Sequence, residues 1–162
     1  MKIIFRFLLL LSVFTLFLNA NNIIDIDAKI EQAKKEKKTI MFFFHVPHCQ
    51  YCKSMLSENF KDNTITELIE EKFILVDIYT ADEKEVIFKS FKGTPSEFGK
   101  HIGAYAYPAT LFMDINAKVI HKAIAYRNID EFLIEMKYIA TQSYKQMDLE
   151  AFKLKIELEE DE

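Results

Sequence analysis

The 162-residue chain contains only two cysteines, no surplus of basic residues and, apart from a stretch at its start, no long apolar run. Two cysteines are too few for a framework of structural disulfides. The formal net charge of −4 leaves no excess of cations with which to hold nucleic acid. The chain also lacks internal repeats and low-complexity segments, and its length suits one domain of ordinary size.

The first twenty residues have the pattern of a secretory signal peptide. Lys2 and Arg6 make the start basic, Phe7–Leu18 is almost entirely apolar, and Ala20 is a small residue at a plausible cleavage site. We expect residues 1–20 to be removed by cleavage after Ala20. The alternative is an uncleaved N-terminal anchor, but this apolar stretch is shorter than the roughly 20 residues that a membrane-spanning helix needs. In both cases the folded part is expected to be exported.

The two cysteines, Cys49 and Cys52, form a C-x-x-C motif shortly after the apolar run 39–44. That run is too short for a helix and is typical of a central strand covered on both faces. If a helix begins after this strand, the first sulfur lies at its N-terminus, where free N–H groups and the helix dipole stabilise a thiolate. Because the thiolate is the species that attacks disulfides, the motif predicts thiol–disulfide exchange.

Hydrophobic periodicity divides the rest of the chain into alternating helices and strands. Further strands are expected at 73–78, 109–114 and 118–125, the last two joined by the short connection 115–117. Helices are expected over 24–37, after the cysteines, from a capping box at Thr64–Glu67, from Thr94 to Gly103, and from Asn128 or Asp130 through Ile139.

Two stretches are ambiguous. Val86–Phe88 with Phe91 fits an extra short strand before the turn at Gly93. The C-terminal acidic tail, 143–162, alternates apolar and charged residues as a strand does, but its apolar residues also recur at helical spacing. We expect the last residues, which are acidic, to be frayed.

The order β-α-β-α followed by β-β-α resembles the thioredoxin fold. The segments that carry the resemblance are Phe42–Lys53 (FFFHVPHCQYCK) and Tyr105–Asp114 (YAYPATLFMD), and the match covers about residues 25–142. The chain looks closest to exported bacterial thioredoxin-like proteins, the group of periplasmic disulfide isomerases and thiol reductases. This resemblance implies an α/β fold over residues 21–142, with a central mixed β-sheet of four to five strands flanked by helices, and a periplasmic location.

The resemblance also implies roles for particular residues. Cys49 would be the attacking nucleophile, and Cys52 would resolve the mixed disulfide. Pro108 would be the cis proline that stands beside the cysteines in this family, leaving the backbone of Tyr107 free to pair with an incoming peptide. The tripeptide ending at Pro95 mimics the family's proline motif, but no strand follows it, so Pro95 is interpreted as a helix-start residue.

The sequence departs from the family at three points. Phe43 stands where thioredoxins carry a buried acid that relays a proton to the resolving thiol, and His48 replaces the usual tryptophan before the first cysteine. The dipeptide Gln50–Tyr51 contains no proline. Protonated His48 could favour the Cys49 thiolate, or it could be an exposed loop residue without a role. Tyr51 is interpreted as a partly exposed contact residue.

These features predict an exported oxidoreductase that reduces or isomerises protein disulfides without a dissociable cofactor. Its expected partners are protein thiols and disulfides, with a membrane electron donor for a reductase, and no nucleic acid. One alternative is a metal-handling protein that binds copper or zinc through His45, His48, Cys49 and Cys52, although no metal site is expected. The other alternative is a non-catalytic thioredoxin-fold binding module.

Overall fold

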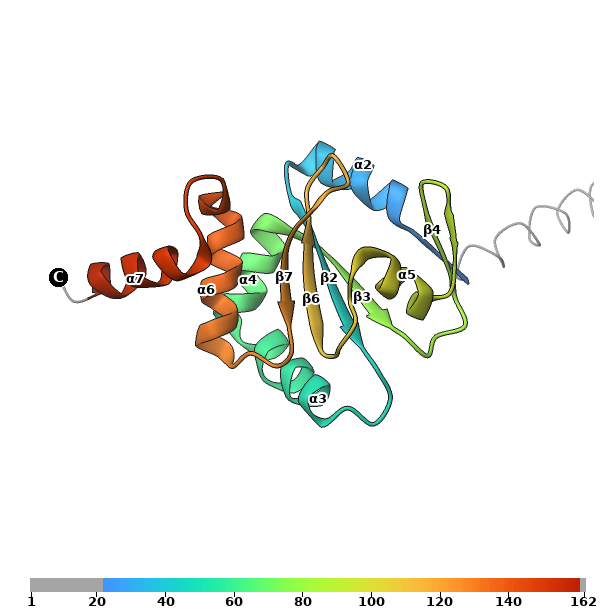
Figure 1. The fold of residues 1–162 in the computed structure, drawn as a ribbon, viewed down its shortest axis with the longest axis horizontal. Coiled ribbons are helices and arrows are strands. Elements are labelled where there is room, and N and C mark those ends of the chain that lie inside the picture. The colour runs from blue at the N-terminus through green and yellow to red at the C-terminus, as the bar shows by residue number, and fades with distance from the viewer. Residues whose placement is uncertain (1–21, 161–162) are drawn as a thin grey trace, which may run out of the picture.

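We describe residues 22–160 in a computed structural model; the predicted signal peptide and the last two residues of the tail lie outside this range. Within the described residues, no helix combines the length and the apolar character that a bilayer crossing requires. The chain folds as an α/β structure around a mixed sheet, as expected for a thioredoxin fold (Figure 1).

The central sheet has four strands in the order β3-β2-β6-β7. These strands are β2 (Thr39–His45), β3 (Phe73–Tyr79), β6 (Ala109–Met113) and β7 (Val119–Ile124). β2 pairs in parallel with β3 and antiparallel with β6, which in turn pairs antiparallel with β7. Because β2 is central and carries Ile40 to Phe44, all nearly inaccessible to solvent, it is covered on both faces as the apolar run predicted.

Helices cover both faces of this sheet. α2 (Ile26–Glu36) and α5 (Pro95–Ile102) pack on the face that carries Phe42 and Phe44. α3 (Gln50–Ser57), α4 (Asn63–Lys72) and α6 (Ile129–Ala140) pack on the opposite face, around Met41 and Phe43 (Figure 1). The alternation of side chains along β2 thus divides the core into two apolar clusters.

A second, smaller sheet lies beside α5 (Figure 1) and has the order β1-β4-β5. Its strands are β1 (Ile23–Asp25), β4 (Glu85–Phe88) and β5 (Phe91–Gly93). The extra strand expected near residue 86 is therefore present. The first predicted helix begins later than expected, at Ile26, because Ile23–Asp25 pairs with β4 and the Asp25 side chain caps the helix by accepting from the Ala28 N–H.

The capping box predicted at Thr64–Glu67 is wrong. A short 3₁₀ segment, Asn59–Lys61, leads directly into α4. The Asp62 side chain caps the start of α4 by accepting from the Ile65 N–H at 3.0 Å. Aspartate is at least as good an N-cap as threonine, and it stands two residues earlier, so the helix starts there. The capping box at Thr94, with Pro95 as the first helical residue, is present as predicted.

The tail is helical rather than extended or frayed within the described residues. A 3₁₀ turn, Ser143–Lys145, is followed by α7 (Leu149–Glu160), which projects from the α6 side of the domain (Figure 1). Phe152 is 4% exposed and its ring centroid lies 5.4 Å from that of Tyr138 on α6. The Tyr138 hydroxyl also donates to the Met147 carbonyl at 2.8 Å, so the first part of the tail is fastened to the domain.

Candidate functional site

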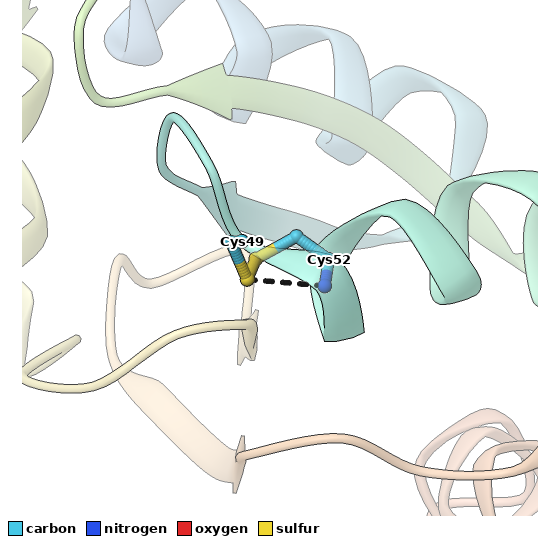
Figure 2. Close-up of a disulfide and its surroundings, with 2 residues drawn as sticks. All are labelled: Cys49 and Cys52. Carbon is cyan, nitrogen blue, oxygen red and sulfur yellow. Dashed lines mark hydrogen bonds between the residues drawn. A yellow bond between two sulfur atoms is a disulfide. The ribbon is translucent and has the colours of Figure 1, made fainter.

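Cys49 and Cys52 form a disulfide at the C-terminal end of β2, where the chain turns into α3 (Figure 2). The S–S distance is 2.04 Å and the two Cα atoms are 5.2 Å apart. Cys49 is the N-cap of α3, and its sulfur accepts from the Cys52 N–H at 3.1 Å. The first sulfur therefore lies where the sequence predicted, at the N-terminus of a helix and within reach of a free N–H group.

The two sulfurs differ in their access to solvent. Cys52 is 2% exposed, whereas Cys49 is partly exposed. An incoming thiol can approach only a sulfur that it can reach, so of the two sulfurs Cys49 is the accessible one. His48, which precedes it, is exposed and has a left-handed backbone with φ 57°, unusual for a residue with a side chain.

Pro108 lies at the same edge of the sheet as the cysteines. Ala109, the first residue of β6, pairs with Phe44 near the end of β2, which places Pro108 beside the point where the chain leaves toward Cys49. The Tyr107–Pro108 peptide bond is cis, and the Pro108 carbonyl accepts from the Ala125 N–H at 2.9 Å. This last bond ties the segment after β7 to the segment before β6.

The Tyr107 side chain is partly buried against the core of the domain. It packs on the cluster that contains Phe44, with its hydroxyl oxygen 3.6 Å from the position that a Cβ on Gly99 would occupy. Burial raises the pKa of the Tyr107 hydroxyl above its usual value.

Phe43 fills the place of the family's buried acid with an apolar ring. It is 1% exposed, and its centroid lies 4.7 Å from Phe60 and 5.6 Å from His45. Its neighbour on β3 is Asp77, whose Oδ1 lies 3.0 Å from His45 Nε2, although the two are not aligned as a hydrogen bond. A small cavity of about 110 Å³ beside Phe43 is lined almost entirely by apolar side chains.

The residues proposed for a metal site are not gathered around one point. His45 packs between the rings of Phe43 and Tyr79, with Asp77 against its Nε2. Across residues 22–160, no three or more His, Cys, Asp or Glu side chains are placed to hold a metal ion together.

A buried charged network that the sequence analysis missed supports the loop after β7. Glu135 on α6 is 2% exposed, accepts from the Arg127 guanidinium and lies 2.7 Å from His121 Nε2. Burial raises the pKa of the Glu135 carboxyl, but the hydrogen bonds and charges of His121 and Arg127 outweigh it and hold the pKa below its usual value. The sequence signal was an acidic residue beside Phe132 and Met136 on a core-facing helix stripe, since such a residue needs a partner.

The same loop brings Tyr126 to the cysteines. The Tyr126 ring centroid lies 5.6 Å from that of Tyr51, the residue between the two cysteines. Tyr51 is 65% exposed, so this contact lies at the surface beside the disulfide. Tyr126 carried no sequence signal, because only the folded register of β7 against β6 brings its loop to this edge.

Solved structures of similar fold include several redox proteins. A thioredoxin-fold protein from Helicobacter pylori has a TM-score of 0.65 at 19% identity, over 75% of this chain and 86% of that one. A thioredoxin from Thermus thermophilus has a TM-score of 0.57 at 18% identity, over 73% and 85%. The oxidised DsbD C-terminal domain from Neisseria meningitidis has a TM-score of 0.51 at 16% identity, over 69% and 90%.

These identities are low, so the solved structures establish the fold alone. No sequence among the curated proteins matches the chain. The family model described as a thioredoxin-like domain, however, matches residues 26–140, from the start of α2 to the end of α6. The fold and the cysteine pair are those of thiol–disulfide oxidoreductases, and the chain belongs to the thioredoxin-like domain family.

Proposed function

We propose that this protein is an exported thiol–disulfide oxidoreductase that acts on protein disulfides through Cys49 and Cys52. The observation that carries the proposal is the difference between the two sulfurs. Cys49 is a partly exposed helix N-cap whose sulfur accepts an N–H, whereas Cys52 is buried behind it. One sulfur is thus suited to attack a substrate, and the other to react only within the protein.

The reaction proceeds by two exchanges. The Cys49 thiolate attacks one sulfur of a substrate disulfide, which forms a mixed disulfide and releases the other substrate sulfur as a thiolate. Cys52 then attacks the Cys49 sulfur, forms the Cys49–Cys52 disulfide and releases the second substrate sulfur as a thiol once the Cys52 proton has been transferred. Two electrons pass from the protein dithiol to the substrate, and the disulfide described above is the oxidised product.

The N-terminus of α3 lowers the barrier to the first exchange. The Cys52 N–H that donates to the Cys49 sulfur, and the positive end of the helix dipole, stabilise negative charge on that sulfur. The exposed His48 adds a further cation when it is protonated. The backbone of Tyr107, next to Pro108, pairs with an extended substrate segment so that its disulfide meets Cys49.

The favoured direction is reduction or isomerisation in the periplasm. The signal-peptide pattern of residues 1–20 supports export. The electron pair resides on the two sulfurs, so no dissociable cofactor is required, but the oxidised pair must be re-reduced by a partner dithiol. A membrane electron donor is the class of partner that can supply one outside the cytoplasm.

Insulin reduction by dithiothreitol tests the proposal. The full chain without its first twenty residues should accelerate insulin precipitation, and Cys49→Ala should return the rate to that of dithiothreitol alone. Cys52→Ser should accumulate a mixed disulfide between Cys49 and the substrate, visible by mass spectrometry and reversed by reductant. Equal rates for the wild type and Cys49→Ala, with no trapped mixed disulfide, would refute the proposed enzymatic activity. The non-catalytic binding module would then be the remaining hypothesis.

A further inference from the structure

The surface beside the redox pair carries an aromatic contact that the exchange chemistry itself does not require. Tyr51 and Tyr126 come from different elements, yet their ring centroids are 5.6 Å apart with planes inclined by 38°. Tyr51 is 65% exposed and Tyr126 is partly exposed. One exposed ring and one partly exposed ring in contact present apolar surface to whatever approaches Cys49.

Tyr126 is held in place by the loop on which it lies. The Ala125 N–H donates to the Pro108 carbonyl at 2.9 Å, on one side of the ring. On the other side, Arg127 donates to Glu135 and, through Nη1, to the Tyr126 carbonyl at 3.0 Å. The backbone that carries the ring is therefore fixed relative to both Pro108 and α6.

A second buried side chain fixes the same loop. Asn59 is fully buried, and its Nδ2 donates to the carbonyl oxygens of Arg127 and Asn128 at 3.1 and 3.2 Å. These are groups of a surface loop, whose mobility would otherwise be high. Ordering Tyr126 before a substrate arrives reduces the entropy lost on binding, as in other preorganised binding surfaces.

The other tyrosines near this edge do not offer the same surface. The Tyr107 ring is partly buried and packs on the apolar cluster that contains Phe44. Tyr105 is 78% exposed, but its Cε2 lies 3.7 Å from the position of a Cβ on Gly103, at the end of α5. Tyr51, which lies between the two cysteines, and Tyr126, whose ring contacts it, are the tyrosines that the structure places at the redox pair.

We infer that Tyr51 and Tyr126 form an aromatic rim that selects substrate cysteines flanked by aromatic or large apolar side chains. The inference rests on the proposed function, since the substrate must reach Cys49, and it specifies the substrate class. A flanking ring that stacks on the rim buries apolar area and gains the preference of aromatic pairs for offset or edge contacts. A serine at the same place can do neither.

Two peptide disulfides test the inference. Each is the disulfide-linked dimer of a short uncharged peptide that contains a single cysteine. In one peptide Phe flanks the cysteine on both sides, and in the other Ser does. Single-turnover rate constants are measured with the pre-reduced protein, so no electron donor is needed. We expect the wild type to favour the Phe peptide by roughly ten-fold, because each stacking contact changes affinity by roughly three- to ten-fold.

The decisive variant is Tyr126→Ala, because Tyr126 is distant in sequence from the cysteines. This substitution should reduce the ratio of the two rate constants to about two. The reason is that a higher concentration of the Phe peptide is then needed to reach half of the maximal rate. Tyr126→Phe should keep the wild-type ratio, which separates a contact role from a folding defect. Tyr105→Ala, an exposed tyrosine outside the rim, serves as the matched control and should also keep that ratio.

The possible failures are distinguishable. The selectivity of the aromatic rim is refuted if the wild type reduces both peptides at the same rate, or if Tyr126→Ala discriminates as the wild type does. In either case the proposed oxidoreductase activity is unaffected. If the wild type reduces neither peptide, the proposed function fails, and the rim fails with it.

Discussion

Replacing Glu135 by glutamine should destabilise the domain by about 2 kcal/mol at neutral pH. The carboxylate is buried and joins α6 to Arg127 and to His121 on β7. Glutamine keeps one acceptor oxygen but turns an NH₂ group toward one of the two partners, so one strong hydrogen bond is lost. Breaking a fully buried pair costs about 3–5 kcal/mol.

The partial exposure of the two partners reduces that cost. The Arg127 side chain is 28% exposed and the His121 side chain 18%, so the two groups left behind regain part of their hydration. A loss of about 2 kcal/mol corresponds to a decrease in Tm of about 6 °C for a domain of this size. Urea unfolding at pH 7 and a thermal scan measure both quantities. Glu150→Gln, which removes an 82% exposed carboxylate paired with Lys153, should change stability by less than about 0.5 kcal/mol.

The effect of Glu135→Gln should depend on pH in a known direction. The pKa of Glu135 is lower in the folded state than its ordinary value of 4.5, so the unfolded chain binds more protons. Its stabilising contribution is therefore complete above pH 4.5 and is lost as the pH falls through the folded pKa. The difference between wild type and variant should be largest at pH 7 and decrease toward pH 3. A difference that stays constant, or that grows in acid, would refute the network as a source of stability.

Two further substitutions test the packing. Phe152→Ala should cost about 2–3 kcal/mol in urea unfolding, because the ring packs against Tyr138, whereas the 57% exposed Leu154→Ala should cost less than about 0.5. Gly99→Ala should cost about 1 kcal/mol, because its Cβ would lie 3.3 Å from the fully buried ring of Phe44, which outweighs the gain in helix propensity; an increase in stability would contradict this.

Local patterns were sufficient for the elements that hold the redox pair. The apolar run before the cysteines became β2, and Cys49 became the N-cap of α3, because strand and helix signals here agree over a few residues. The start of α4 was misplaced because two cap candidates two residues apart, Asp62 and Thr64, compete, and Asp62 has the better acceptor. The sequence pattern of the tail fitted both a strand and a helix. The helix is favoured by the contact between Phe152 and Tyr138, which no local pattern contains.

The support of the site depends on long-range contacts in the same way. The side chain of Asn59 reaches the carbonyl of Arg127, and the ring of Tyr51 meets that of Tyr126, across more than sixty residues of chain. Polar residues inside a predicted core stripe, such as Glu135, are a usable sign that such partners exist. Their identity follows only from the register of β7 against β6.

Phe43 bears on the second exchange of the proposed reaction. Cys52 must lose its proton as it attacks the Cys49 sulfur, yet it is buried, and apolar burial favours the neutral thiol. The family's acid is replaced by a buried ring, and the neighbouring Asp77 has a half-exposed side chain directed at His45. The proton must therefore pass to water or to the departing substrate sulfur, which prolongs the mixed disulfide.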